Sequence, residues 1–143
     1  PQLIRDVSQK YGSQCMVLSI EAKKQADNNW EVYTDCARES TGINVSDWVI
    51  EAEKLGAGEI LITSIDQEGT AKGFDIDLIN SISNLVKIPI IASGGYGKPS
   101  DINSAVEAGA NALAFADTLH IKNSNFSELR EAASSYDIDI RVP

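Results

Sequence analysis

Short apolar runs alternate with amphipathic segments along almost the entire chain. The four apolar runs, each of a length typical of a buried strand, are residues 15–20, 60–65, 88–92 and 112–116. Apolar residues at helical spacing predict helices, which span about 3–11, 45–55, 76–85, 99–108 and 126–136. Asn44 and Asp75 stand at N-cap positions before two of these helices. Strands that alternate with helices in this way predict a parallel sheet with covering helices.

A polar interruption after the first apolar run predicts a small β-hairpin. Residues 27–29, with the sequence Asp-Asn-Asn, form a turn signal that is flanked by strand-like segments at 22–25 and 30–34. Residues 40–42 then predict a loop before the next helix. The inserted hairpin explains why the first two apolar runs are further apart than the others.

Two architectures accommodate four strand–helix units. An open doubly wound sheet requires helices on both faces, whereas a (β/α)8 barrel requires eight units and about 250 residues. The chain has 143 residues, so we predict an α/β fold that is half of a (β/α)8 TIM barrel, with residues 1–143 as one domain. Its exposed strand edges and apolar inner layer require a second half. Residue 1 is proline and a helical pattern starts at once, which is typical of a fragment or a processed piece.

The charge balance argues against several classes of partner. The chain carries 12 Lys and Arg residues against 21 Asp and Glu residues, a formal net charge of −9. Nucleic acid and anionic membrane surfaces require clustered positive charge, so neither is an expected partner. No apolar run approaches the ~20 residues of a membrane-spanning helix, and no secretory signal is visible. We therefore expect a cytoplasmic protein.

The cysteines and the histidine indicate neither a disulfide scaffold nor a metal site. Cys15 and Cys36 both lie in strand-like runs, and we expect both to be reduced packing residues. One His and two Cys at scattered positions do not match the ligand spacing of a zinc site. We expect no metal and no cofactor.

Polar residues follow each apolar run, at the edge where parallel α/β folds bind their ligands. These residues are Glu21, Asp66, Asp117 and the segment 93–95. Carboxylates that share one mouth must be solvated, neutralised or used chemically. Helix capping and solvated loop polarity are the alternative interpretation of each single carboxylate.

The segment SGGYG after the third apolar run is the clearest binding signal. Glycines allow backbone N–H groups to approach an anion closely, and the next helix begins there with its positive dipole end. The loop SIDQEGTAKG is a second glycine-bearing loop, in which Glu68, Gly69 and Thr70 could add donors and acceptors at the same mouth. A plain turn that needs positive φ is the alternative interpretation of SGGYG.

These loops resemble a known family. Similarity to the cyclase subunit of imidazole glycerol phosphate synthase, of histidine biosynthesis, is carried by STGINVSDWVIEAEKLGAGEILITSIDQEGTAKGFDIDLI, IPIIASGGYGK and AGANALAFADTLH. The similarity runs from Pro1 to Pro143 and matches the carboxyl-terminal half of that family's barrel, from the fourth helix through the eighth βα unit. A related isomerase of the same pathway shares the SID-like and SGG-like loops but is less similar at GINVSDWV.

The resemblance implies an ammonia-dependent cyclisation. The family receives ammonia from a glutaminase subunit and converts a bis-phosphorylated ribulosyl-formimino nucleotide to imidazole glycerol phosphate and aminoimidazole carboxamide ribotide. Glu21 matches one of two aspartates that act as general acid and base, and Glu59 matches a charged residue that gates the ammonia entrance. The residues that match the phosphate site of this half are Thr63, Glu68, Gly69, Ser93, Gly94, Gly95, Ala116 and Asp117.

Three acidic residues depart from the family's pattern. Glu21 and Glu68 stand where the family has aspartate, and Asp117 replaces a serine beside the phosphate. The extra methylene of Glu21 displaces its carboxyl group by about 1 Å, and such a displacement can cost roughly a hundredfold in rate. Because the second catalytic aspartate and the second phosphate site belong to the other half of the barrel, we expect no significant cyclase activity from the chain alone.

Two further functions stay open. A phosphate-binding half-barrel could work only as a homodimer, in which two copies close one barrel with two equivalent sites. An amidine-forming enzyme of the same superfamily, acting on a sugar of a surface polysaccharide, would share the ammonia route but not the nucleotide. The departures at Glu21, Glu68 and Asp117 are compatible with this third function.

Overall fold

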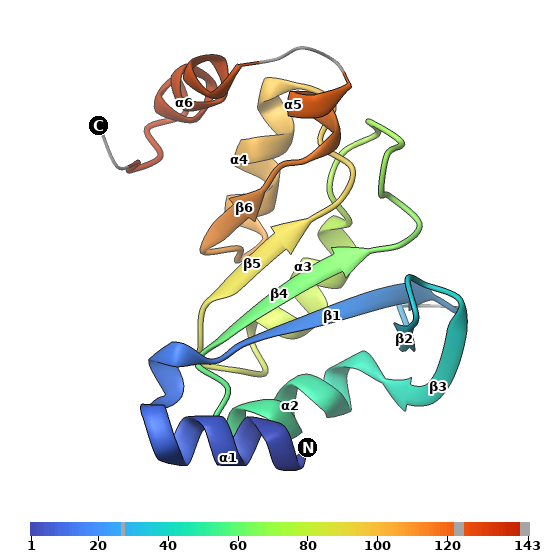
Figure 1. Ribbon diagram of the computed structural model, residues 1–143. Helices are drawn as coiled ribbons and strands as arrows, with labels where there is room; N and C mark the ends of the chain where they lie inside the picture. Colours follow the sequence, from blue (N-terminus) through green and yellow to red (C-terminus); the bar gives the residue numbers. More distant parts are fainter. Residues whose placement is uncertain (27, 122–124, 141–143) are drawn as a thin grey trace.

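The computed structural model describes residues 1–26, 28–121 and 125–140, which are organised around one six-stranded sheet with the order β3-β2-β1-β4-β5-β6 (Figure 1). The strands are β1 (Val17–Lys24), β2 (Trp30–Thr34), β3 (Glu39–Asn44), β4 (Glu59–Ser64), β5 (Ile90–Ser93) and β6 (Ala112–Ala114). The helices are α1 (Gln2–Tyr11), α2 (Val45–Leu55), α3 (Ile76–Ser83), α4 (Pro99–Glu107), α5 (Asp117–His120) and α6 (Phe126–Ser134), with a 3-10 turn, η1 (Ser13–Cys15), before β1. No helix within the described ranges is long and apolar enough to cross a membrane.

The strands β1, β4, β5 and β6 pair in parallel, as the alternation of strands and helices predicts. The helices α2, α3 and α4 pack on one face of these strands (Figure 1). A doubly wound sheet would need helices on both faces. The structure therefore confirms the predicted fold class, a half (β/α)8 barrel with a hairpin after the first strand.

The core lies between the sheet and the helices that cover it. Buried and partly exposed side chains alternate along β1 and β4, which turns Ile20, Ile60 and Ile62 toward the helices. Val49 of α2 and Ile82 of α3 meet them in one cluster. Because side chains alternate along a strand, the remaining residues of β1 and β4 point to the face that these helices leave open.

The hairpin begins inside the first strand. β1 starts at Val17 and continues to Lys24, and its last four residues pair antiparallel with β2, from Glu21 opposite Tyr33 to Lys24 opposite Trp30. The predicted hairpin is therefore confirmed, with an extension of the parallel strand as its first arm. Residue 27 of the predicted turn lies outside the described residues.

The loop predicted at residues 40–42 is wrong, because these residues belong to β3. Polar groups hold this strand against β2, since Thr41 Oγ1 donates to the Val32 carbonyl at 2.6 Å and the Glu31 carboxylate accepts from the Gly42 amide at 2.7 Å. The register between β2 and β3 shifts after Glu31. A strand held by such contacts lacks the apolar alternation from which strands are predicted.

Both predicted N-caps are confirmed. The Asn44 side chain accepts from the amides of Ser46 at 2.8 Å and Asp47 at 3.3 Å at the start of α2. The Asp75 side chain accepts from the Leu78 amide at 3.1 Å at the start of α3. These bonds satisfy amides that have no partner within the first turn of a helix.

The expectation that both cysteines are packing residues is wrong. Cys15 ends the 3-10 turn and Cys36 lies in the turn between β2 and β3, and both are free thiols on the surface. The physical reason is that the apolar run containing Cys15 starts as a turn and becomes a strand only at Val17. At the other end of the sheet, the last apolar run leaves the strand after Ala114 and leads into the short helix α5.

Candidate phosphate-binding site

Four of the strand residues at the open face of the sheet form one row. Glu21 pairs with Thr63, Thr63 pairs with Ser93, and Ser93 pairs with Ala114. Side chains that are paired across parallel strands point to the same face, and their neighbours Ala22, Ser64 and Ala92 are buried on the helix side. The structure thus brings the predicted catalytic residue and two predicted phosphate-site residues into one line.

Glu59 lies at the opposite end of the open face. It is the first residue of β4 and pairs with Val17, the first residue of β1. Thr63 is the fourth residue after it on the same strand, a distance of about 13 Å at the usual rise of a β-strand. The predicted gate residue is therefore placed away from the mouth, with Leu61 of the same face between the two positions.

A pocket opens at the carboxyl ends of β5 and β6. Its lining contains every predicted phosphate-site residue except Thr63. The lining residues are Glu68, Gly69, Ala71, Ser93, Gly94, Gly95, Tyr96, Ala114, Phe115, Ala116, Asp117 and Thr118. Residues from the loops after β4, β5 and β6 thus form one cavity, as the positions of the two glycine-bearing loops predict.

The two glycine-bearing loops are packed backbone against backbone. Gly94 and Gly95 have φ angles of 92° and 103°, in the left-handed region. A Cβ atom at Gly95 would lie 2.1 Å from the Gly73 carbonyl, and the Gly73 amide donates to the Gly95 carbonyl at 2.8 Å. Glycine is therefore required here for the turn and for the close approach, which is also what the plain-turn interpretation demands.

The pocket has a small free volume, and its glycine turn offers unused amide donors. Its volume is about 20 Å³, which is room for one water molecule. Within the described part of the chain, the amides of Gly94 and Gly95 donate no hydrogen bond. The amides at the start of α4 are already used, since those of Gly97 and Lys98 both donate to Asp101 at 2.9 Å. An anion would therefore find its free backbone donors in the glycine turn before the helix.

The Glu21 carboxylate is bound to a turn that the sequence does not signal. Its Oε2 accepts from the Ala37 amide at 2.9 Å. Asp35, Cys36 and Ala37 have φ angles of 52°, 55° and 64°, so three consecutive residues without glycine are left-handed. Glu21 is the fifth residue of β1 instead of its last. The hairpin therefore covers the strand end where the carboxylate was expected to stand free.

The three strand-end carboxylates do not form one group. Asp66 accepts from the Lys24 amide at 2.7 Å, which ties the loop after β4 to the end of β1. Asp117 begins α5 and lines the pocket. Asp66 and Glu21 thus each accept a hydrogen bond from a backbone amide of another segment, as a structural role predicts, and of the three carboxylates Asp117 is the one that lines the pocket.

An aromatic cluster that the sequence analysis missed adjoins the pocket, whose lining includes two of its three residues, Tyr96 and Phe115. The ring of Tyr96 lies 5.0 Å from that of Phe115 and 6.4 Å from that of Phe74, between centroids. Burial, and to a smaller extent the negative charges of Asp101 and Glu128, raises the pKa of Tyr96 above its ordinary value of 10.0. The phenol therefore stays neutral at physiological pH. No spacing in the sequence links these three rings, because they come from three different loops.

Comparisons with known proteins agree with the pattern of these loops. A family model described as "Histidine biosynthesis protein" matches residues 1–125. Three curated relatives carry the name "Imidazole glycerol phosphate synthase subunit HisF". The protein from Legionella pneumophila is 58% identical over 103 residues, which are 72% of this chain and 49% of that protein. The proteins from Streptococcus mutans and Streptococcus sanguinis are 44% and 43% identical over 143 and 144 residues, 99% of this chain and 57% of each relative. The chain spans about half the length of the curated relatives it matches.

Proposed function

The chain belongs to the histidine biosynthesis protein family, and from this premise we propose that it supplies the carboxyl-terminal half of the cyclase subunit of imidazole glycerol phosphate synthase. In the proposed reaction the complete barrel, in the cytoplasm, uses ammonia to convert a bis-phosphorylated ribulosyl-formimino nucleotide to imidazole glycerol phosphate and aminoimidazole carboxamide ribotide. This half binds one of the two phosphoryl groups of the substrate.

The pocket after β5 and β6 carries the proposal. The unused amides of Gly94 and Gly95 are the kind of donor that binds a phosphoryl group without a cationic side chain. The Ser93 and Thr63 hydroxyl groups lie in the row beside them and supply further donors. A net charge of −9 is compatible with such a site, because fixed backbone dipoles act locally.

Glu21 is proposed to transfer protons in the reaction. It is separated from Ser93 by Thr63 on the intervening strand, which places the two positions about 10 Å apart at the usual strand spacing. That distance is comparable to the length of a phosphorylated five-carbon chain. A substrate whose phosphoryl group binds at the glycine turn therefore extends across the row toward Glu21.

The proposed partners occupy the two surfaces that this half leaves exposed. An amino-terminal half-barrel, or a second copy of this chain, covers the open face of the sheet. A glutaminase subunit binds at the end where Glu59 lies, and ammonia enters there. Glu59 and Glu21 lie at opposite ends of the same face, which supports a path from one to the other.

Reconstitution tests this function. We expect no product from the chain alone with ammonium and the ribulosyl-formimino nucleotide, because one catalytic aspartate and one phosphate site are outside it. Co-expression with the amino-terminal half of the Streptococcus mutans relative is expected to produce imidazole glycerol phosphate, measured by chromatography, and Glu21→Gln is the matched inactive control. Turnover by the chain alone, or equal turnover by the variant, contradicts the proposal.

A second candidate function is a phosphate-binding half-barrel that works only as a homodimer. The open face favours it, since Leu61 and Ile91 lie there side by side and are only partly buried. Two copies that share this face would bring two identical pockets to one mouth. A sedimentation mass of a single chain at micromolar concentration contradicts this function.

A further inference from the structure

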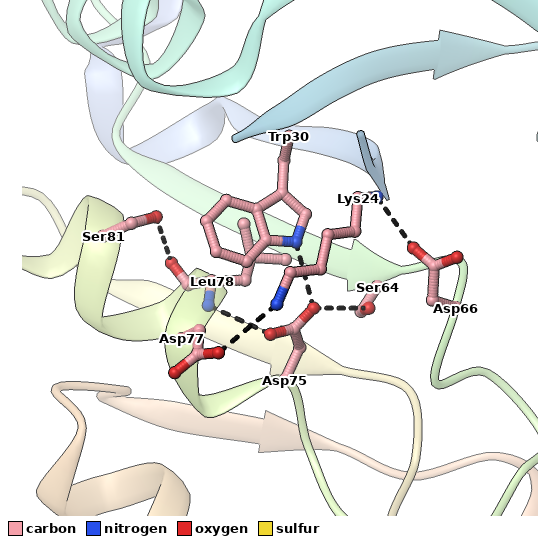
Figure 2. A network of polar contacts seen from close by, with 8 residues as sticks. All are labelled: Lys24, Trp30, Ser64, Asp66, Asp75, Asp77, Leu78 and Ser81. Carbon is pink, nitrogen blue, oxygen red and sulfur yellow. Dashed lines mark hydrogen bonds and ion pairs between the residues drawn. The ribbon is translucent and has the colours of Figure 1, made fainter. Parts of the chain in front are cut away.

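One partly buried carboxylate joins the hairpin to the sheet and to a helix. Asp75 accepts hydrogen bonds from the indole Nε1 of Trp30 at 3.0 Å, from the Ser64 hydroxyl at 3.1 Å and from the Leu78 amide at 3.1 Å (Figure 2). Trp30 and Ser64 are 3% and 2% exposed. N-capping of α3 requires only the bond to Leu78, so the other two bonds serve a different purpose.

Contacts near the turn end of the hairpin hold the same loop from its other side. The Lys24 amide donates to Asp66 at 2.7 Å, and the Lys24 ammonium group lies 3.3 Å from Asp77 (Figure 2). The Ile65 amide donates to the Ala22 carbonyl at 2.9 Å. The segment from residue 65 to residue 75, which connects β4 to α3, is therefore attached to the hairpin near both of its ends, and the first turn of α3 is attached through Asp77.

Ser64 continues this connection to the pocket. Its carbonyl oxygen accepts from the Glu68 amide at 3.0 Å, which folds the loop back over the end of β4. The same oxygen would lie 3.0 Å from a Cβ atom on Gly94. A chain of contacts thus runs from Trp30 through Asp75 and Ser64 to the wall of the pocket.

We propose that Asp75 is a positioning residue, which together with Trp30 of the hairpin holds the loop backbone at Glu68 and Gly69 in place as one wall of the phosphate site. The proposal rests on the proposed phosphate site. The hairpin then has a role at the binding site. The indole N–H of Trp30 fixes the shape of the loop between β4 and α3, although Trp30 lies on a different element. Neither residue contacts the ligand.

The variant Trp30→Phe tests the positioning role, because it keeps an aromatic ring and removes the indole N–H that donates to Asp75. We expect its dissociation constant for inorganic phosphate, measured by NMR titration of the chain, to rise roughly tenfold. Val32→Ala is the matched control, since Val32 is 7% exposed on the same strand and its apolar side chain has no hydrogen-bond donor for these carboxylates. The control is expected to lower the melting temperature and to leave phosphate binding unchanged.

Amide hydrogen exchange separates this proposal from the phosphate site itself. We expect the Glu68 and Thr70 amides, which donate to the Ser64 and Gln67 carbonyls at 3.0 Å, to exchange faster in Trp30→Phe than in Val32→Ala, with or without phosphate. Absence of phosphate binding in the unchanged chain rejects the phosphate site, while the exchange rates still decide the positioning role. Equal exchange of the loop amides in the two variants overturns the proposal.

Discussion

Glu68 is placed where its charge opposes the ligand of the proposed site. Its Oε2 lies 3.1 Å from the position that a Cβ atom of Gly94 would take, so the carboxylate fills part of the mouth. The cavity beside it holds about 20 Å³, which is less than a phosphoryl group needs. The side chain is exposed and free to rotate toward solvent. Entry of an anion therefore requires this carboxylate to move aside.

Removal of the charge at residue 68 is expected to strengthen anion binding. Glu68→Gln keeps the shape of the side chain and removes a repulsion that is worth about 1 kcal/mol at 4 Å in water. We expect inorganic phosphate to bind roughly fivefold more tightly, as measured by NMR titration. Glu39→Gln, on the exposed edge strand β3, is the control for net charge. Weaker binding in Glu68→Gln would show instead that the carboxylate helps to hold the ligand.

At the scale of elements, the pairing of β2 with β3 is stabilised by polar contacts of Glu31. The Glu31 carboxylate accepts from the Ser40 hydroxyl and from the Gly42 amide. The Ser40 bond, followed by the Gly42 bond, lowers the pKa of Glu31 below its ordinary value of 4.5. A group whose pKa is lower in the folded state stabilises that state above its unfolded pKa, and the stabilisation is lost as the pH falls through the folded pKa.

The hairpin is therefore expected to loosen at acidic pH before the rest of the chain. The Gly42 amide signal, followed by NMR while the pH falls through and below 4.5, is expected to report a midpoint below that value. Glu31→Gln removes the titrating group and should abolish this step. A midpoint at or above 4.5, or an unchanged step in Glu31→Gln, contradicts the assignment.

Elements whose signal is local were predictable from the sequence. The helix α2 has an N-cap at Asn44, an apolar stripe and Gly56 as its left-handed end, and all three are set by residues within the helix or next to it. The strand β3 and the turn at Cys36 were not predictable in the same way. The strand β3 is stabilised by Glu31 of β2, and the turn is stabilised by Glu21 of β1. Contacts between residues far apart in the sequence leave no signal in the local hydrophobic pattern.

The candidate site shows the same division. The glycine turn at residues 94–95 was predictable, because only glycine adopts such a conformation easily. The second role of Asp75 was not, since Trp30 lies 45 residues away and reaches it only through the folded hairpin. N-capping explained Asp75 completely from local sequence, so nothing in the pattern pointed to further partners.

At the scale of the whole molecule, the open face of the sheet is the surface that favours association. The central positions of this face are Ser19, Leu61, Ile91 and Ala112, which pair with one another across the four parallel strands. In the described ranges of the chain, the helices α2, α3 and α4 cover the opposite face (Figure 1). In a complete barrel this layer is packed inside. An exposed apolar layer next to free strand edges favours association with another half.

A charge placed in the centre of that layer is expected to separate the copies. The unchanged chain should sediment above the mass of one chain at micromolar concentration, because pairing removes Leu61 and Ile91 from water. Leu61→Lys should give a folded single chain, since the residue is only partly buried and points away from the helices. Leu3→Lys, at a residue that is 69% exposed on α1, is the control and should leave the association unchanged. If Leu61→Lys and Leu3→Lys sediment alike, the open face is not the surface through which the copies associate, and an edge strand such as β3 becomes the candidate instead.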